Sequence, residues 1–225
     1  MGSVLKPRDH MNLANMCKSN YALHNWWSDW IIESTDHLHK FSVENMAFYF
    51  LRSQGVLYLT IRGSDDIWDW MYNIRAGSLL TNGIHQGTYL LHKKIWPKVR
   101  EFVNDNWCPH DCDQLVIGGH SMGGMVALTI LRELIAVENR PVRATAVFGT
   151  PSPFSLFRGK HEASQDWTAN LTRYVNGNDI VPRLLNWRGN YPVGKEVKIG
   201  KSARWRFFKS FSDHNMAEYV KSMSR

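Results

Sequence analysis

QLVIGGHSMGGMVALTILRELI, residues 114–135, passes from a short apolar run through a glycine-rich segment into a second apolar run. Gln114 to Ile117 have the composition of a short strand, and the glycines that follow are typical of a tight turn. After the turn, apolar side chains recur at helical spacing, at Met125, Val126, Ile130, Leu131, Leu134 and Ile135. The sequence therefore predicts a strand, a sharp turn and a buried helix in direct succession.

The turn contains a serine between two glycines, in the order Gly119-His120-Ser121-Met122-Gly123. This order fits G-x-S-x-G, in which a strained turn exposes the serine and flanking side chains would collide with the neighbouring strand and helix. The pattern meets its structural condition here, because an apolar strand precedes it and an apolar helix follows. We predict that Ser121 is a nucleophile. The alternative is a glycine-rich packing turn with an incidental serine.

A serine hydroxyl needs a base to remove its proton and an acid to orient that base. Asp179 follows a strand-type run in a loop rich in turn formers, and sheets of this type hold their sites in such loops. His214 is the only histidine after Asp179, and the order serine, acid, histidine is that of the G-x-S-x-G hydrolases. We predict that Asp179 and His214 complete a triad, the alternative being that His214 is an exposed histidine at a helix start. His120 is expected to be a packing or elbow residue.

Strand-type and helix-type segments alternate along most of the chain, which favours one α/β domain over residues 1–225, with a mostly parallel central sheet flanked by helices. Residues 1–45 are expected to be an N-terminal helical segment, with one or two helices between 11 and 34. The other expected elements are a hairpin of residues 47–51 and 55–61, a helix over 86–106 that Pro97 kinks or divides, strands at 144–148 and 171–175, and a helix over 216–223.

Composition excludes several classes of protein. The 225 residues are 44% apolar and 21% charged, and no apolar run is long enough to span a bilayer. The first residues lack the apolar core of a secretory signal, and three cysteines make no disulfide framework, so a cytoplasmic location is expected. Cys108, His110 and Cys112 lack a second ligand pair, so we expect a polar loop there rather than a metal site.

The formal charge of +7 is concentrated in residues 183–209. This segment holds one acidic residue, Glu196, and eight basic ones: Arg183, Arg188, Lys195, Lys198, Lys201, Arg204, Arg206 and Lys209. Such a patch favours contact with an anionic membrane surface, whereas nucleic acid is not the expected partner. The alternative is a solvated edge that keeps the protein soluble.

Six short motifs, taken together, resemble the class 3 lipases, the fungal-type triacylglycerol lipase family of the α/β-hydrolase fold. They follow one another in family order over residues 47–220. The motifs are Ile61-Arg62-Gly63-Ser64, His85-Gln86-Gly87, Gly119 to Gly124, Phe148-Gly149-Thr150-Pro151, Val175 to Leu184, and His214 with Tyr219. The resemblance implies that Ser121, Asp179 and His214 are the catalytic triad, in agreement with the choice made from the residues themselves.

The resemblance also implies an oxyanion hole and a lid. The oxyanion hole would be formed by Ser64, which follows the Arg-Gly pair, and by the backbone N–H of Met122, which follows the nucleophile. The lid would be a short helix within residues 65–74, where Ile67, Trp70, Met71 and Ile74 make one apolar stripe. A permanently packed core helix would have the same spacing.

We therefore expect a serine carboxylic-ester hydrolase that acts on lipid esters through an acyl-enzyme and needs no metal or organic cofactor. Two alternatives remain open at this point. One is a phospholipase or lysophospholipase, favoured by the basic segment. The other is a hydrolase-like binding module in which the serine is idle and the basic segment binds a membrane or nucleic acid.

Overall fold

The computed structural model describes the greater part of the chain. The described residues are 7–20, 37–43, 46–53, 55–63, 80–107, 114–186, 189–201 and 212–224. The expected lid at 65–74, the expected oxyanion-hole residue Ser64 and the loop with Cys108, His110 and Cys112 lie outside these ranges.

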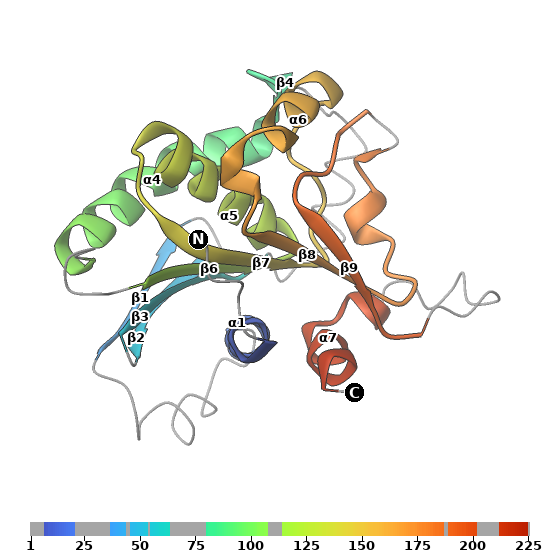
Figure 1. Cartoon of the computed structure of the whole chain (residues 1–225), viewed down its shortest axis with the longest axis horizontal. Helices are drawn as coiled ribbons and strands as arrows, with labels where there is room; N and C mark the ends of the chain where they lie inside the picture. The colour runs from blue at the N-terminus through green and yellow to red at the C-terminus, as the bar shows by residue number, and fades with distance from the viewer. Residues whose placement is uncertain are drawn as a thin grey trace.

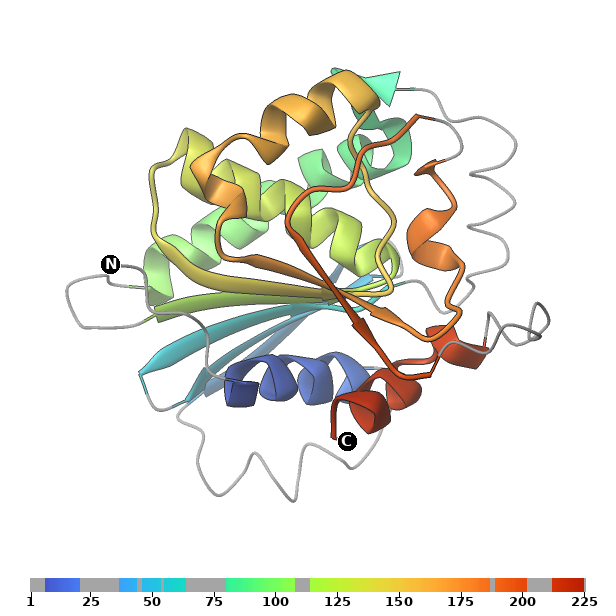
Figure 2. The same cartoon turned by 45° about the vertical axis from the view of Figure 1, so that its right-hand side comes forward.

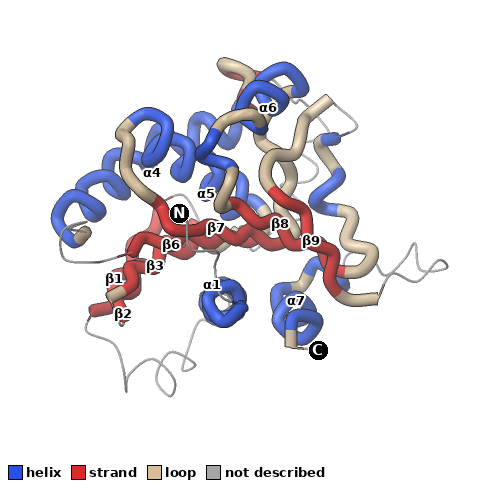
Figure 3. The backbone as a smooth tube through the Cα atoms, in the orientation of Figure 1, coloured by secondary structure: helices blue, strands red, loops and turns tan. Residues whose placement is uncertain are grey.

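A seven-stranded sheet in the order β1-β2-β3-β6-β7-β8-β9 crosses the middle of the molecule (Figures 1 and 3). The first three strands are antiparallel, and β3 and every strand after it in this order pair in parallel. The prediction of a mostly parallel sheet is confirmed. The strands are β1 (His37–Val43), β2 (Met46–Ser53), β3 (Val56–Ile61), β6 (Gln114–His120), β7 (Val142–Phe148), β8 (Leu171–Asn176) and β9 (Lys195–Ile199), and β4 (Leu80–Thr81) and β5 (Ile84–His85) form a separate small hairpin.

Helices cover both faces of the sheet, as Figure 2 shows from the side. Helices α4 (Gln86–Asn106), α5 (Met122–Arg132) and α6 (Leu156–Ala163) lie on one face, and α1 (Pro7–Ser19) and α7 (Met216–Met223) lie side by side on the other. Because both faces are covered, the central strand β6 is buried from Leu115 to His120, as expected for a parallel sheet.

Two apolar clusters fill the space between the sheet and its helices. The larger one joins β2, β3 and β6 to α4 and α5, and the smaller one joins the sheet to α1 and α7 through residues such as Leu13, Phe148 and Tyr219. Burying a side chain of this size stabilises the fold by about 1.5 to 3 kcal/mol. The carboxyl ends of the parallel strands are thereby held in fixed positions.

Pro97 does not divide helix α4, which is continuous from Gln86 to Asn106. The buried residues of α4 lie on one stripe that includes Ile95 and Val99, whereas Pro97 is exposed to solvent. The backbone carbonyl that loses its N–H partner to the proline can be satisfied by water on that side.

The N-terminal segment 1–45 is not helical throughout, which corrects the prediction. Helix α1 lies within it, but residues 37–43 form the edge strand β1, which pairs antiparallel with β2. Helix α6 and the other edge strand, β9, were also not predicted. Edge strands and short helices bury little apolar surface, so their sequences lack the regular spacing that marks the central elements.

The remaining predicted elements are confirmed, with small shifts at their ends. The hairpin is β2–β3, the strands at the centre are β6, β7 and β8, and the predicted helix over residues 216–223 is α7. Among the described residues, no helix is long and apolar enough to cross a membrane.

Candidate active site

Ser121 occupies a strained turn between β6 and α5. Its backbone has φ 55° and ψ −127°, a region that residues with a side chain rarely adopt. A Cβ on Gly119 would lie 2.6 Å from the carbonyl oxygen of Gly123, and one on Gly123 would collide with the carbonyl oxygen of Ile61. The predicted reason for the two glycines is confirmed, because a side chain at either position would push the turn apart.

Asp179 lies in the loop that follows β8, and its side chain is buried. One carboxylate oxygen, Oδ1, accepts the backbone N–H of Val181 at 2.9 Å. The other, Oδ2, lies 2.8 Å from Nδ1 of His214, close enough to accept the imidazole N–H. The two residues that were predicted as acid and base are therefore a hydrogen-bonded pair.

His214 is buried, with 5% of its surface exposed, so it is not an exposed histidine at the start of α7. With Nδ1 donating to the Asp179 carboxylate, the neutral ring has an unprotonated Nε2 that can accept a proton. This Nε2 is buried and has no hydrogen-bond partner within the described ranges. A buried nitrogen without a partner is rare in folded proteins, and here it is the atom that a general base requires.

The surroundings of His120, Phe148 and Gly149 place His214 beside the serine turn. Nε2 of His120 bonds the backbone carbonyl of His214 at 2.9 Å, and the centres of the two rings are 4.6 Å apart. The backbone N–H of Ser121 donates to the carbonyl of Phe148 at 2.9 Å, and a Cβ on the next residue, Gly149, would lie 2.8 Å from the His214 ring. The serine turn and the imidazole therefore flank the end of β7.

His120 holds the backbone of His214 through a hydrogen bond. Because a carbonyl oxygen can only accept, Nε2 of His120 is the donor in its bond to His214. Burial, and then the positive charge that His214 carries when protonated, hold the pKa of His120 well below its usual range. His120 is thus neutral at pH 7, whether or not His214 is protonated, and keeps its hydrogen bond. The expectation of a packing or elbow residue is confirmed, but its bond to His214 was not predicted.

Tyr219 is a further partner of Asp179. Its hydroxyl donates to Oδ2 at 2.6 Å from helix α7, and the side chain is fully buried. Burial, and then the Asp179 carboxylate, raise the pKa of Tyr219 well above its ordinary value, so the phenol keeps its proton. The sequence contained one signal for this contact, the tyrosine that follows His214 in the family motif.

The candidate oxyanion hole is described only in part. Met122 is the first residue of α5, where backbone N–H groups have no acceptor within the helix. Arg62 and Gly63 lead from β3 toward Ser64, and a Cβ on Gly123 would lie 2.8 Å from the carbonyl carbon of Arg62. The chain before Ser64 therefore passes against the serine turn. Within the described ranges, no group of three His, Cys, Asp or Glu side chains could hold a metal ion.

Replacing Gly149 with alanine is expected to lower kcat about 100-fold with little change in KM, because small displacements of reacting groups cost about that much. The new Cβ would meet the His214 ring at 2.8 Å and Oδ2 of Asp179 at 2.9 Å. Steady-state hydrolysis of p-nitrophenyl butyrate measures the effect. Gly55→Ala is the matched control, since Gly55 also has a positive φ but nothing within 4 Å of a Cβ. Equal losses in both variants would mean that backbone strain alone is responsible.

Comparisons with known proteins concern the family and the fold. A family model described as Lipase (class 3) matches residues 58–189, more than half of the chain. No curated protein sequence matches the chain.

Solved lipase structures share its fold. Lipase II from Rhizopus niveus is 19% identical with a TM-score of 0.70, over 88% of this chain and 81% of its own. A lipase from Rhizopus microsporus var. chinensis is 16% identical with a TM-score of 0.71, over 95% and 89%. A triacylglycerol lipase whose catalytic centre is formed by a serine protease triad is 16% identical with a TM-score of 0.70, over 88% and 82%. At these sequence identities, the similarity establishes that the fold is shared and nothing beyond the fold.

Proposed function

Because the chain belongs to the class 3 lipase family and is a carboxylic ester hydrolase that acts on lipid esters, we propose that Ser121, His214 and Asp179 are its catalytic triad. One observation carries the proposal. Nε2 of His214, buried and without a partner among the described residues, lies in a ring that Asp179 holds through Nδ1 next to the serine turn. The triad reported for the triacylglycerol lipase of similar fold gives it further support.

In the first half of the reaction, Nε2 of His214 removes the proton from the Ser121 hydroxyl as Oγ attacks the ester carbonyl. A bond forms between Oγ and the carbonyl carbon, and the carbonyl oxygen becomes an oxyanion. The N–H of Met122 and the Ser64 side chain and backbone are the proposed donors to that oxygen. When the tetrahedral intermediate collapses, His214 returns its proton to the departing alcohol, which leaves an acyl-enzyme on Ser121.

In the second half, His214 removes a proton from a water molecule as the water attacks the acyl carbon. The second tetrahedral intermediate collapses, Ser121 recovers its proton from His214, and the fatty acid is released. In both halves, the Asp179 carboxylate orients the imidazole and stabilises its positive charge. The donors Tyr219 and Val181 keep that carboxylate in place by using its other hydrogen-bonding positions.

A fluorophosphonate probe tests the assignment of the nucleophile. Only an activated serine attacks the phosphorus and becomes labelled, so the wild-type chain should be labelled at Ser121 and the Ser121→Ala variant should not. Mass spectrometry of the labelled peptide identifies the site. Labelling at another serine, or none in a folded and active protein, would contradict the triad.

A phospholipase activity is the second candidate, and the described part of the basic segment favours it. Arg183, Lys195, Lys198 and Lys201 are all exposed, and Lys195 and Lys198 lie on the edge strand β9. Cations at such a surface attract anionic lipids, at about 1 kcal/mol for each residue. A panel of p-nitrophenyl esters, triglycerides and phospholipids, each hydrolysed by the wild-type protein, distinguishes a lipase from a phospholipase.

Replacing Lys198 and Lys201 with glutamine is expected to weaken binding to anionic vesicles about thirtyfold at low salt. Hydrolysis of a soluble short-chain ester should not change, because both lysine side chains are exposed and neither has a described contact with Ser121, Asp179 or His214. Co-sedimentation at low and physiological salt measures the binding, since salt screens charges beyond about 8 Å. Lys98→Gln, an exposed lysine on α4, is the control. If the double variant binds as tightly as the wild type, these lysines serve only to prevent edge-to-edge pairing of β9.

A further inference from the structure

A cavity of about 660 Å³ lies between helices α4, α5 and α6 and the β4–β5 hairpin. None of its lining residues belongs to the triad. Arg132, which contributes to its wall from α5, lies eleven residues beyond Ser121, or roughly 16 Å of helix rise. The cavity is therefore separate from the catalytic centre.

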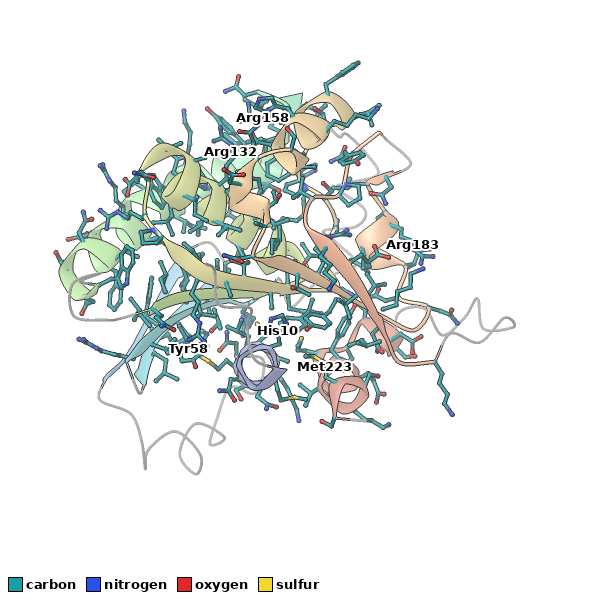
Figure 4. The ribbon with its side chains drawn as sticks, in the orientation of Figure 1. His10, Tyr58, Arg132, Arg158, Arg183 and Met223 are labelled. Carbon is teal, nitrogen blue, oxygen red and sulfur yellow. The ribbon has the colours of Figure 1, made fainter. Side chains whose placement is uncertain are left out.

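Two arginines in the wall are fixed by one buried carboxylate. Nε of Arg132 donates to Oε1 of Glu162 at 2.7 Å, and Nε of Arg158 donates to the same oxygen. Trp167 donates to the second oxygen, Oε2, at 2.8 Å. Burial raises the pKa of Glu162, but hydrogen bonds from Arg132 and Trp167 and the two positive charges outweigh it and leave the pKa lowered. Glu162 therefore stays ionised and holds both guanidinium groups side by side (Figure 4).

Each guanidinium group keeps its terminal Nη donors for other partners, because the bond to Glu162 uses Nε. Arg132 also lies 3.8 Å from Glu133, a weak ion pair, and both arginine side chains are about a quarter exposed. The charged residues that line the cavity are Lys93, Arg132, Arg158 and Glu133. The three positive charges exceed the negative charges of Glu133 and of Glu162, which bonds the two arginines. Paired guanidinium groups with an excess of positive charge suit a phosphate group.

Helix α4 provides an acceptor to the cavity. The hydroxyl of Thr129 donates to the carbonyl of Val126, so the Nδ1 of His92, 3.1 Å away, is the donor to that hydroxyl. Burial, and then the charge of Arg132, lower the pKa of His92 to about 4, so the ring is neutral at pH 7 and its Nε2 can only accept. The cavity thus combines donors for an anion with an acceptor for a hydroxyl group.

The elements that contribute lining residues to the cavity also carry exposed apolar side chains. The three elements that build its outer wall each carry one or more: Leu80 on the hairpin is 46% exposed, Leu90 on α4 is 52%, and Leu156 and Phe157 on α6 are 40% and 86%. Phe157 directly precedes Arg158 in the chain. Such a group is unfavourable in water and typical of a surface that contacts an apolar partner. These exposed side chains, here called the apolar rim, and the cationic cavity on the same elements match the acyl chains and the phosphate of a phospholipid.

We propose that this cavity binds the phosphate group of a phospholipid, whose acyl chains lie against the apolar rim. Arg132, Arg158 and Lys93 bind the phosphate oxygens, and Phe157 and Leu156 contact the acyl chains. The site lies outside the triad and involves no covalent step. It would hold a lipid, or the surface of a lipid layer, whether or not that lipid is hydrolysed.

Calorimetric titration of the full chain with dihexanoyl phosphatidic acid, below its micelle concentration, tests the proposal. Ser121→Ala protein is used so that the ligand is not hydrolysed. Lys93→Gln and Arg158→Gln should each weaken binding about fivefold or more, as expected for one cationic contact with a lipid phosphate. Lys98→Gln, an exposed lysine on the same helix that does not line the cavity, should have no effect. Lys93 contacts only the Tyr89 ring among the interactions described, so its replacement leaves the Glu162 cluster intact.

Two further ligands separate phosphate binding from lipid binding. Dihexanoylglycerol, which lacks the phosphate, should bind more weakly than the phosphatidic acid, and inorganic phosphate should also bind more weakly because it lacks acyl chains. Phe157→Ser should weaken binding of the phosphatidic acid but not of inorganic phosphate, whereas Val137→Ser, also exposed and apolar, should change neither. Equal affinity of the wild type, Lys93→Gln and Arg158→Gln proteins for the phosphatidic acid would overturn the proposal. Inorganic phosphate that binds as tightly as the phosphatidic acid would overturn the assignment to a lipid.

Discussion

Ser121→Ala protein is expected to lose on the order of 10⁵ to 10⁶ in kcat while it keeps its fold. The variant has no nucleophile, so no acyl-enzyme forms, and the remaining rate comes from substrate binding and the oxyanion donors alone. Alanine removes only the hydroxyl. Its backbone must adopt the same strained conformation as Ser121, so the melting temperature should change little.

Hydrolysis of p-nitrophenyl butyrate, measured under saturating substrate, gives the effect on kcat. Ser164→Ala is the control, because this serine is exposed at the end of α6 and should retain full activity. A double variant of Ser121→Ala with His214→Ala should be no slower than Ser121→Ala alone, since the two residues act as one unit. If the kcat losses of the two single variants multiply in the double variant, His214 acts on a different step from Ser121.

Asp179→Asn is expected to lower kcat about 10⁴-fold. The native carboxylate accepts from three donors, with Tyr219 and His214 on Oδ2 and the N–H of Val181 on Oδ1. An asparagine has one acceptor oxygen and an NH₂ group that can only donate. If its NH₂ group faces His214, the imidazole must carry its proton on Nε2 and can no longer accept the Ser121 proton. If the NH₂ group faces the backbone N–H of Val181 instead, these two hydrogen-bond donors point at each other in a buried position without an acceptor.

The effect of Asp179→Asn should be on kcat far more than on KM, because the substrate does not contact Asp179 in the proposed mechanism. Its dependence on pH is a second measurement, since hydroxide can partly replace an impaired base and the variant should recover rate at high pH. Asp166→Asn, an exposed aspartate in the turn after α6, is the control for the charge change. A loss of less than tenfold would contradict the assignment of Asp179 as the acid of the triad.

The central elements and the three candidate triad positions could be proposed from the sequence because local patterns and chain order indicate them. Apolar spacing marks the strand before Ser121 and the helix after it. The glycines beside the serine indicate that backbone segments approach each other closely, and the structure contains this approach. The positions of Asp179 and His214 followed from chain order. The structure places these two residues in contact and His214 beside the serine turn, while their catalytic roles stay a prediction.

Contacts between distant residues could not be predicted from the sequence. The bond from His120 to the carbonyl of His214 joins positions 94 residues apart, and no local pattern specifies it. The shared oxygen of Glu162 depends equally on how α5 and α6 pack, so the cationic cavity gave no signal in the sequence. The charge pattern of the sequence instead predicted a lipid contact in another segment, residues 183–209. Hydrogen bonds between residues far apart in the sequence depend on how the sheet and its helices pack together, which a local pattern does not encode.

The adjacent packing of α1 and α7 has a consequence for the order in which the molecule assembles. These helices are the first and last of the described chain, and together they seal one face of the sheet. Contacts between such distant segments carry a high entropic cost of loop closure and form late on a folding pathway. Tyr219, which secures Asp179, belongs to α7, and His214 directly precedes that helix. We therefore expect refolding molecules to acquire hydrolytic activity only when α1 and α7 dock, after most of their secondary structure has formed.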